Sequence, residues 1–140
     1  MNSPNKFPLN NQFHQTYRVG IRRQTRQVNV GGVLIGGNAP ISVQTMTKTK
    51  TSDIAGTVEQ IKRAADAGCD IIRVTVNDKE AADAIGEIVK QSSIPVVADI
   101  HFNHVFALNS IEANVAKVRL NPGNIGSKER IQEVLSAAKK

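Results

Sequence analysis

The sequence predicts an α/β fold: the first half of a (β/α)8 barrel, with about four βα units, preceded by a β-hairpin. Segments rich in β-branched residues alternate with amphipathic segments at a spacing of about 20 to 30 residues, which is typical of parallel βα units. The strand segments are nearly continuous apolar runs, as in sheets that are buried on both faces. A complete barrel has eight units and about 250 residues, whereas this chain has 140.

The first part of the chain divides into a leader and a hairpin. Residues 1–19 are rich in Asn, Gln and Pro and have no apolar period, so we expect a disordered leader. The partial barrel domain is expected to cover residues 20–140. Residues 28–35 alternate around Gly31 and Gly32, which predicts a β-hairpin because glycine tolerates the positive φ of a tight turn.

Four strand–helix units are predicted after the hairpin. Their helices carry apolar stripes, and capping residues or a terminal glycine, such as Gly68, mark their ends. The strands are predicted at residues 41–46, 70–76, 96–100 and 115–120. The helices are predicted at residues 54–67, 79–91, 104–113 and 128–139. The chain is therefore expected to hold strands one to four of a barrel.

Composition and charge argue against several classes of function. No apolar run is long enough to span a membrane and no secretory signal is visible, so we expect a cytoplasmic protein. The net charge is +6, and seven basic residues precede Asp53, the first acidic one. This basic segment lacks interleaved aromatic residues and any nucleic-acid motif, so no nucleic-acid partner is expected. It is interpreted as a solvated arm, or as one that attracts an anionic substrate.

The single cysteine, Cys69, stands between a helix segment and a strand segment. One cysteine excludes both an internal disulfide and a multi-cysteine metal site within this sequence. Cys69 is therefore interpreted as a small buried hydrophobe, and no metal ligand is assigned.

The parity of side chains along the strands gives the most informative functional signal. Alternate residues of a strand face opposite sides. Three sets share the face toward the barrel axis: Ile71, Arg73 and Thr75; Val97, Asp99 and His101; and Lys117, Arg119 and Asn121. The opposite face is uniformly apolar and suits packing against helices. The axial face becomes polar toward the carboxyl end of each strand, where parallel α/β folds place their sites.

The polar residues on the axial face favour an anionic ligand. Burying charged side chains costs free energy unless they pair with each other or meet a ligand. Cations outnumber carboxylates there, and arginine binds phosphate through two parallel hydrogen bonds, so a phosphate ester is expected. The alternative is a structural ion pair, such as Arg73 with Asp99, that closes the barrel mouth.

Two loops at the same end of the barrel give weaker signals. Successive N–H groups in Asn121–Gly126 can form an anion nest, although a plain βα turn is favoured. The Thr47–Thr51 segment is either a solvated loop or a loop that lines the substrate. His14 in the leader has no specific role, and His104 is interpreted as a surface or capping residue.

Four segments together carry a family resemblance. They are Pro-Ile-Ser-Val-Gln-Thr-Met-Thr at 40–47, Cys-Asp-Ile-Ile-Arg-Val at 69–74, Val-Ala-Asp-Ile-His-Phe at 97–102 and Val-Arg-Leu-Asn-Pro-Gly-Asn-Ile-Gly at 118–126. In order and interval they resemble 4-hydroxy-3-methylbut-2-enyl diphosphate synthase of isoprenoid biosynthesis.

The resemblance implies a homodimeric, two-domain oxidoreductase with an N-terminal (β/α)8 barrel and a C-terminal iron–sulfur domain. It implies reductive ring opening of 2-C-methyl-D-erythritol 2,4-cyclodiphosphate, with electrons from flavodoxin or ferredoxin passing through a [4Fe–4S] cluster. Carried over by motif, the substrate-binding residues are Arg73, Asp99, His101, Arg119 and Asn121. No catalytic residue is assigned within this chain.

The sequence lacks the second half of the barrel and the iron–sulfur domain that the resemblance implies. We therefore expect the chain to supply part of the substrate site, to bind no cluster and to be inactive alone. One alternative is a non-catalytic half barrel that binds anions or self-associates. Another is a different barrel enzyme, such as a pterin-binding synthase, which the Asp-Ile-His and Asn-Pro-Gly-Asn segments fit less well.

Overall fold

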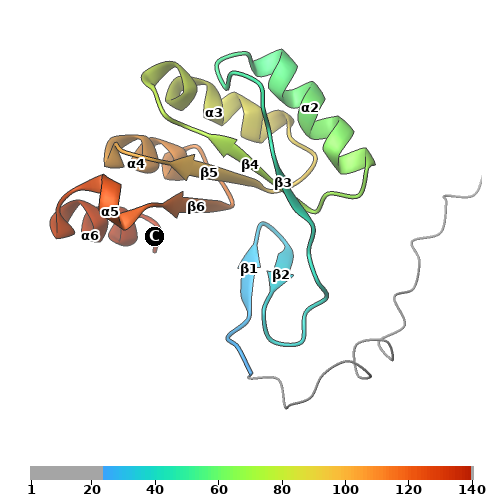
Figure 1. The fold of residues 1–140 in the computed structure, drawn as a ribbon, viewed down its shortest axis with the longest axis horizontal. Coiled ribbons are helices and arrows are strands. Elements are labelled where there is room, and N and C mark those ends of the chain that lie inside the picture. Colours follow the sequence, from blue (N-terminus) through green and yellow to red (C-terminus); the bar gives the residue numbers. More distant parts are fainter. Residues whose placement is uncertain (1–23, 140) are drawn as a thin grey trace, which may run out of the picture.

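The architecture is a four-stranded parallel sheet, a row of helices on one face and a separate β-hairpin (Figure 1). The computed structural model describes residues 24–139. The predicted disordered leader at residues 1–19 lies outside them. In the described part of the chain, no helix has the length and apolarity needed to cross a bilayer.

The hairpin has the predicted place and turn. Strands β1 (Val28–Val30) and β2 (Val33–Ile35) pair antiparallel. Gly31 and Gly32 connect them with φ of 57° and 96°, backbone angles that glycine adopts without the steric cost of a Cβ. A Cβ on Gly31 would come within 2.9 Å of side-chain carbons of Pro95 and Ala116, so the turn sits tightly against the segments that start the sheet strands.

The four parallel strands follow one another in sequence order across the sheet. They are β3 (Gln44–Met46), β4 (Ile71–Thr75), β5 (Val96–Ile100) and β6 (Lys117–Leu120). This order confirms the predicted first four strands of a barrel. The first strand begins at Gln44 and not at residue 41, because the Val43 carbonyl accepts from two successive amides and the regular ladder begins only after it. Residue 115 belongs to the turn after a helix, since the Val115 amide donates to the Ser110 carbonyl.

The four predicted helices are present as α2 (Ile54–Asp66), α3 (Lys79–Gln91), α4 (His104–Glu112) and α6 (Lys128–Ala137). Side chains of Asp53, Asp78 and Asn103 accept from free amides in the first turns of α2, α3 and α4. Such caps satisfy donors that have no partner within the helix. A short helix, α5 (Pro122–Ile125), was not predicted as a helix.

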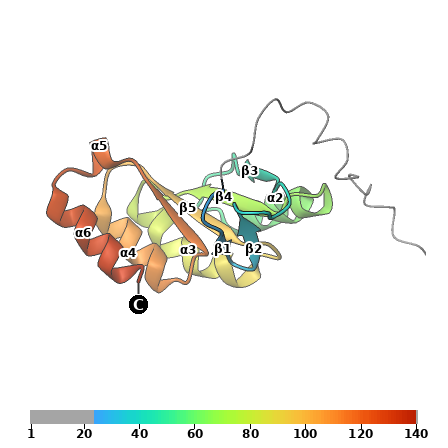
Figure 2. The same cartoon turned by 90° about the horizontal axis from the view of Figure 1, so that it is seen from below.

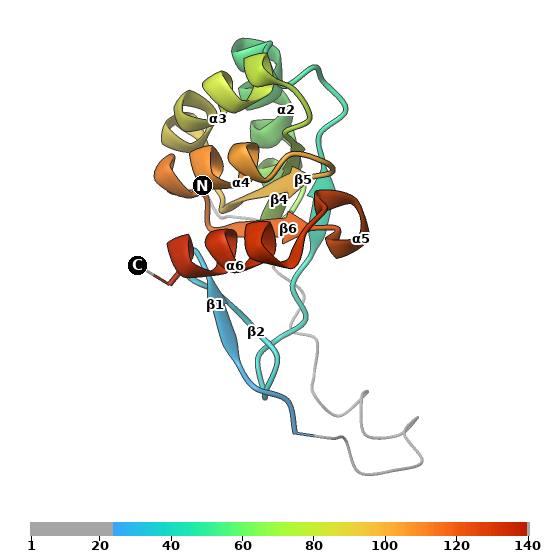
Figure 3. The same cartoon turned by 90° about the vertical axis from the view of Figure 1, so that its left-hand side faces the viewer.

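The sheet has a different apolar core on each face. Alternate residues of the strands, among them Ile72, Val74 and Ile100, pack against the helices in the larger core. Ile71 and Val97 point to the other face and pack against Val30 of the hairpin. Figures 2 and 3 show α2, α3 and α4 gathered on one face of the sheet. The predicted division of the strands into two faces is confirmed.

Candidate functional site

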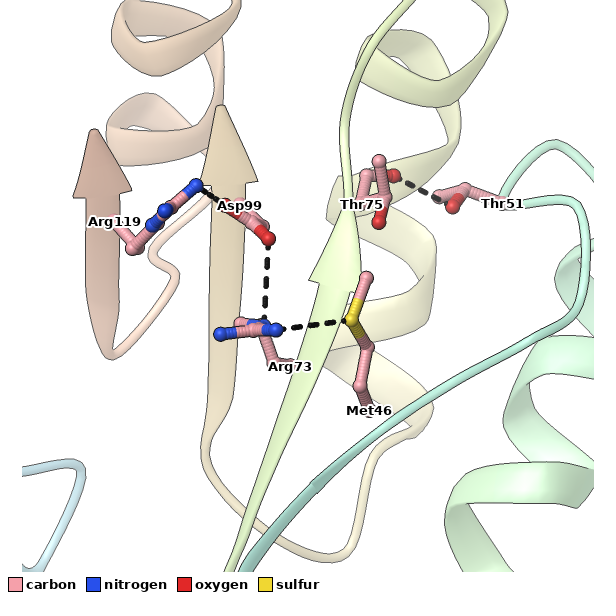
Figure 4. A network of polar contacts seen from close by, with 6 residues as sticks. All are labelled: Met46, Thr51, Arg73, Thr75, Asp99 and Arg119. Carbon is pink, nitrogen blue, oxygen red and sulfur yellow. Dashed lines mark hydrogen bonds and ion pairs between the residues drawn. The ribbon is translucent and has the colours of Figure 1, made fainter. Parts of the chain in front are cut away.

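A buried carboxylate on β5 joins an arginine on β4 and another on β6, toward the carboxyl ends of the strands (Figure 4). Asp99 is the last residue but one of β5, and its side chain is only 3% exposed. Its Oδ1 accepts a hydrogen bond of 3.0 Å from Arg119 Nη1, and its Oδ2 lies 3.3 Å from Arg73 Nε. Asp99 and Arg119 are register partners in β5 and β6, so the sheet itself places the pair. Three of the predicted site residues therefore meet.

The two arginines keep unused hydrogen-bonding capacity. Their side chains are 34% exposed for Arg73 and 43% exposed for Arg119. A guanidinium has five N–H donors, and the contacts with Asp99 use few of them. Two cations around one carboxylate also leave a net positive charge. The structural ion pair considered as an alternative is formed, yet it leaves a cationic surface that suits an anion.

Met46 is a member of this network that sequence reasoning did not identify. Arg73 Nη2 donates to Met46 Sδ at 3.2 Å, and the two residues are register partners in β3 and β4. Parity along the first strand was the available signal, since it places Met46 two residues from Gln44 on the axial face.

The other predicted residues lie near the network without contacting it. His101 follows β5, and its Nδ1 is buried with no hydrogen-bond partner in the described part of the chain. Its ring is tilted 38° to that of the exposed Phe102, at 6.1 Å. Asn121 caps α5, because its Oδ1 accepts from the Gly123 amide at 3.2 Å. Lys117 is exposed at the start of β6, two residues before Arg119.

Comparison with known proteins decides the family. The model of the GcpE TIM-barrel domain matches residues 25–140. This chain belongs to the GcpE TIM-barrel family. The prediction of a partial TIM barrel in a diphosphate synthase family is thereby confirmed.

Several curated relatives carry the same name, 4-hydroxy-3-methylbut-2-en-1-yl diphosphate synthase (flavodoxin). The protein from Rhodospirillum rubrum is 53% identical over 125 residues, which are 89% of this chain and 33% of the relative. The protein from Persephonella marina is 54% identical over 119 residues, which are 85% of this chain and 34% of the relative. The chain therefore spans about a third of the length of the curated relatives it matches.

A solved structure supports the fold alone. Dihydropteroate synthase from Xanthomonas albilineans, in complex with 7,8-dihydropteroate, superposes with a TM-score of 0.55 at 15% identity. The match covers 83% of this chain and 61% of that chain. The dihydropteroate synthase thus shares the fold of this chain. The relatives that are similar in sequence carry the name of the diphosphate synthase.

The two loops at the mouth of this GcpE-family barrel are held by internal hydrogen bonds. In α5, the amides of Asn124 and Ile125 donate to the Asn121 carbonyl, so these two amides are not free to form an anion nest. The segment is one short helix, where a plain turn was favoured. In the Thr47–Thr51 loop the threonines are directed inward, and the Thr51 hydroxyl donates to the Thr75 carbonyl at 2.7 Å. Lys48 and Lys50, which alternate with these threonines, are exposed. The threonines therefore anchor the loop, and the lysines are solvated.

The described residues of this GcpE-family chain do not fit an iron–sulfur cluster. Such a cluster is held by several cysteine thiolates. Cys69 is the one cysteine, and its buried thiol donates to the Ile71 carbonyl at 3.0 Å. Among residues 24–139 no three His, Cys, Asp or Glu side chains are placed to hold a metal ion. His104 instead lies 3.5 Å from Glu133, between α4 and α6, and His14 is outside the described range.

Proposed function

We propose that this chain forms one wall of the substrate site of a 4-hydroxy-3-methylbut-2-en-1-yl diphosphate synthase. The reaction proposed for the whole enzyme is reductive ring opening of 2-C-methyl-D-erythritol 2,4-cyclodiphosphate in isoprenoid biosynthesis. The family membership and the shared name of relatives that are more than half identical support this proposal. Because the chain spans about a third of those relatives, it contributes substrate binding to the reaction and not the whole of it.

The observation that carries the proposal is the pair of contacts between Asp99 and the two arginines, Arg73 and Arg119, which we call the arginine clamp. The cyclic diphosphate is an anion, and guanidinium groups bind phosphoryl oxygens through directed, charge-assisted hydrogen bonds. Asp99 is buried with both oxygens engaged, so its role is to hold Arg73 and Arg119 in place. A held guanidinium loses less conformational freedom when the ligand arrives.

His101 and Asn121 flank the clamp and complete the proposed wall. The Oδ1 of Asn121 is used by the cap of α5, which leaves its Nδ2 as a donor for a substrate oxygen. His101 lies two residues beyond Asp99, so strand parity predicts the same face for its half-buried side chain, and on this proposal it contacts the ligand. Both residues thus add neutral or titratable groups beside two fixed cations.

Electron supply and assembly belong to parts of the enzyme outside this chain. On this proposal flavodoxin or ferredoxin is the electron donor, through a [4Fe–4S] cluster, and the name of the relatives favours flavodoxin. The described residues contain no ligand set for that cluster. A homodimer and a cytoplasmic location are part of the same proposal.

Calorimetric titration of the full 140-residue chain with the cyclic diphosphate tests this function. Arg73→Ala and Arg119→Ala should each weaken binding by about tenfold or more, because a hydrogen bond to a charged group contributes about 1.5–3 kcal/mol. Arg63→Ala is the matched control, since this arginine is exposed on α2 and takes no part in the network. A folded chain that binds no cyclic diphosphate would contradict the proposal and favour a non-catalytic half barrel.

A further inference from the structure

We propose that Met46 is a positioning residue for anion binding: its thioether fixes the plane of the Arg73 guanidinium so that one free edge faces the ligand. The inference rests on the proposed function and adds a residue to its site. It starts from the contact between Arg73 Nη2 and Met46 Sδ at 3.2 Å (Figure 4).

The guanidinium of Arg73 is held from two neighbouring strands. On the β5 side, Nε lies 3.3 Å from Asp99 Oδ2; on the β3 side, Nη2 donates to Met46. A planar group that is anchored at two of its three nitrogens has a fixed orientation. The contacts of Arg73 within residues 24–139 use Nη2 and Nε, so Nη1 is the nitrogen that the fixed plane presents to a ligand.

The Arg73–Asp99 contact alone does not fix this plane. Arg73 Nε is buried and lies within ion-pair distance of Asp99, yet it makes no hydrogen bond of good geometry. This contact therefore supplies attraction but no directed hydrogen bond that would orient the guanidinium plane. The thioether supplies the second point of attachment, and Met46 is the register partner of Arg73 on the adjacent strand.

A sulfur acceptor suits this role better than an oxygen acceptor. Thioether sulfur is a weak, polarizable acceptor that carries no charge. It orients the guanidinium without neutralising it, whereas a carboxylate at this position would match both arginines with acids and remove the net positive charge. A leucine would keep the volume of the side chain and leave the donor without a partner.

The test compares Met46→Leu with Met46→Gln in the full 140-residue chain, with inorganic pyrophosphate as the probe. Met46→Leu conserves volume and should keep the thermal midpoint within a few degrees. It should weaken pyrophosphate binding by about threefold to tenfold, the effect of one lost hydrogen bond that orients a ligand-binding group. Met46→Gln restores a neutral acceptor and should return the affinity to within about twofold of the original. A residue that only fills space would show the opposite order.

A spectroscopic readout tests the contact without a ligand. The chain has two methionines, Met1 and Met46, so a chain labelled with [¹³C-methyl]methionine gives two methyl signals, and Met46→Leu assigns them. The Met46 signal should move in Arg73→Ala and again when pyrophosphate is added. If the chemical shift of the Met46 methyl group stayed the same in Arg73→Ala and after addition of pyrophosphate, the inference would be overturned.

The outcomes separate this inference from the proposed function. If the unmodified chain binds pyrophosphate, Arg73→Ala abolishes binding and Met46→Leu binds as well as the original, the positioning role alone is overturned. If the folded chain binds no pyrophosphate, both the proposed function and the positioning role fail. A threefold to tenfold loss of pyrophosphate affinity in Met46→Leu, with near-original affinity in Met46→Gln, supports both the proposed function and the positioning role.

Discussion

The two ends of the axial face contrast sharply, although they are built from the same strands. At the amino end, Ile71 and Val97 are buried beneath Val30 of the hairpin. At the carboxyl end, one pleat further along, Arg73 and Arg119 surround Asp99 and remain partly exposed. On β4, for example, the buried Ile71 and the partly exposed Arg73 are only two residues apart. In barrel folds generally, the amino ends of the strands contribute stability and the carboxyl ends carry the sites.

The hairpin is the physical cause of the difference. Its tight turn packs against Pro95 and Ala116, so residues of the chain itself close the amino end. At the carboxyl end, the described residues leave Arg73 and Arg119 partly exposed around the buried Asp99. The predictions below test this separation, in order of decreasing effect on stability.

Ile71→Ala should have the largest effect on stability. Removing a buried isoleucine side chain beneath the hairpin should lower the free energy of unfolding by about 2–5 kcal/mol, through lost apolar burial and the cavity left behind. Urea denaturation measures this change. Ile41→Ala is the control, because that side chain is 72% exposed. If pyrophosphate affinity of the folded Ile71→Ala protein fell as well, the two ends would not be independent.

The double variant Arg73→Ala/Arg119→Ala should come next. It leaves the Asp99 carboxylate buried without a partner, which should lower the free energy of unfolding by about 2–4 kcal/mol. The partial exposure of both arginines places this cost below that of fully buried pairs. Each single variant leaves one partner and should cost much less than half of this value. A double-mutant cycle measures the difference, and additive single effects would contradict a shared carboxylate.

Gly31→Ala should destabilise the chain more than Gly32→Ala. Both glycines have positive φ, so each alanine should cost about 1 kcal/mol from backbone strain. At Gly31 the new Cβ would also meet Pro95 and Ala116, whereas a Cβ on Gly32 has no neighbour within 4 Å. The free energy of unfolding of Gly31→Ala should therefore be lower than that of Gly32→Ala by about 1 kcal/mol. Thermal denaturation of the two variants measures this difference. Equal midpoints would show that the hairpin tip is not tightly packed.

Lys50→Met should have the smallest effect. Lys50 and Glu80 form a 2.9 Å ion pair at the carboxyl end, but both side chains are more than two-thirds exposed. The hydrogen bond to Glu80 raises the pKa of Lys50 above its ordinary value of 10.5. A raised lysine pKa contributes stability that is present below pH 10.5 and is lost as the pH rises through the folded-state value. The urea midpoint should be unchanged at pH 7, since exposed pairs contribute little; a clear loss would mean that the loop anchor depends on this pair.

Most of the fold could be predicted from the sequence because local signals agree with the tertiary arrangement. Strand and helix periods, capping residues and the paired glycines of the hairpin all indicate the same elements. The limits of the first and last strands were the exception. The strand that starts at Gln44 is an edge strand whose ladder begins irregularly, and hydrogen-bond geometry of this kind leaves no trace in composition.

The candidate site could be predicted in part, because parity and parallel order bring Arg73, Asp99 and Arg119 to one end of the sheet. Parity states which face a side chain occupies, but it does not state which atoms meet. Side-chain rotamers and strand register decide that Asp99 contacts both arginines. They also decide that the Oδ1 of Asn121 accepts the hydrogen bond that caps α5. The roles of the five predicted residues in substrate binding stay predictions.

The βα order, the two faces of each strand and the hairpin turn follow from sequence alone, since each depends on residues that are close in the chain or on a periodic pattern. The family resemblance also needs only the sequence, because it rests on motifs and their spacing. The folded structure was needed to show that the hairpin covers Ile71 and Val97, and that Met46 contacts Arg73. These contacts join segments 27 or more residues apart in sequence. Their geometry depends on how the strands pack and align, which is a property of the folded chain as a whole.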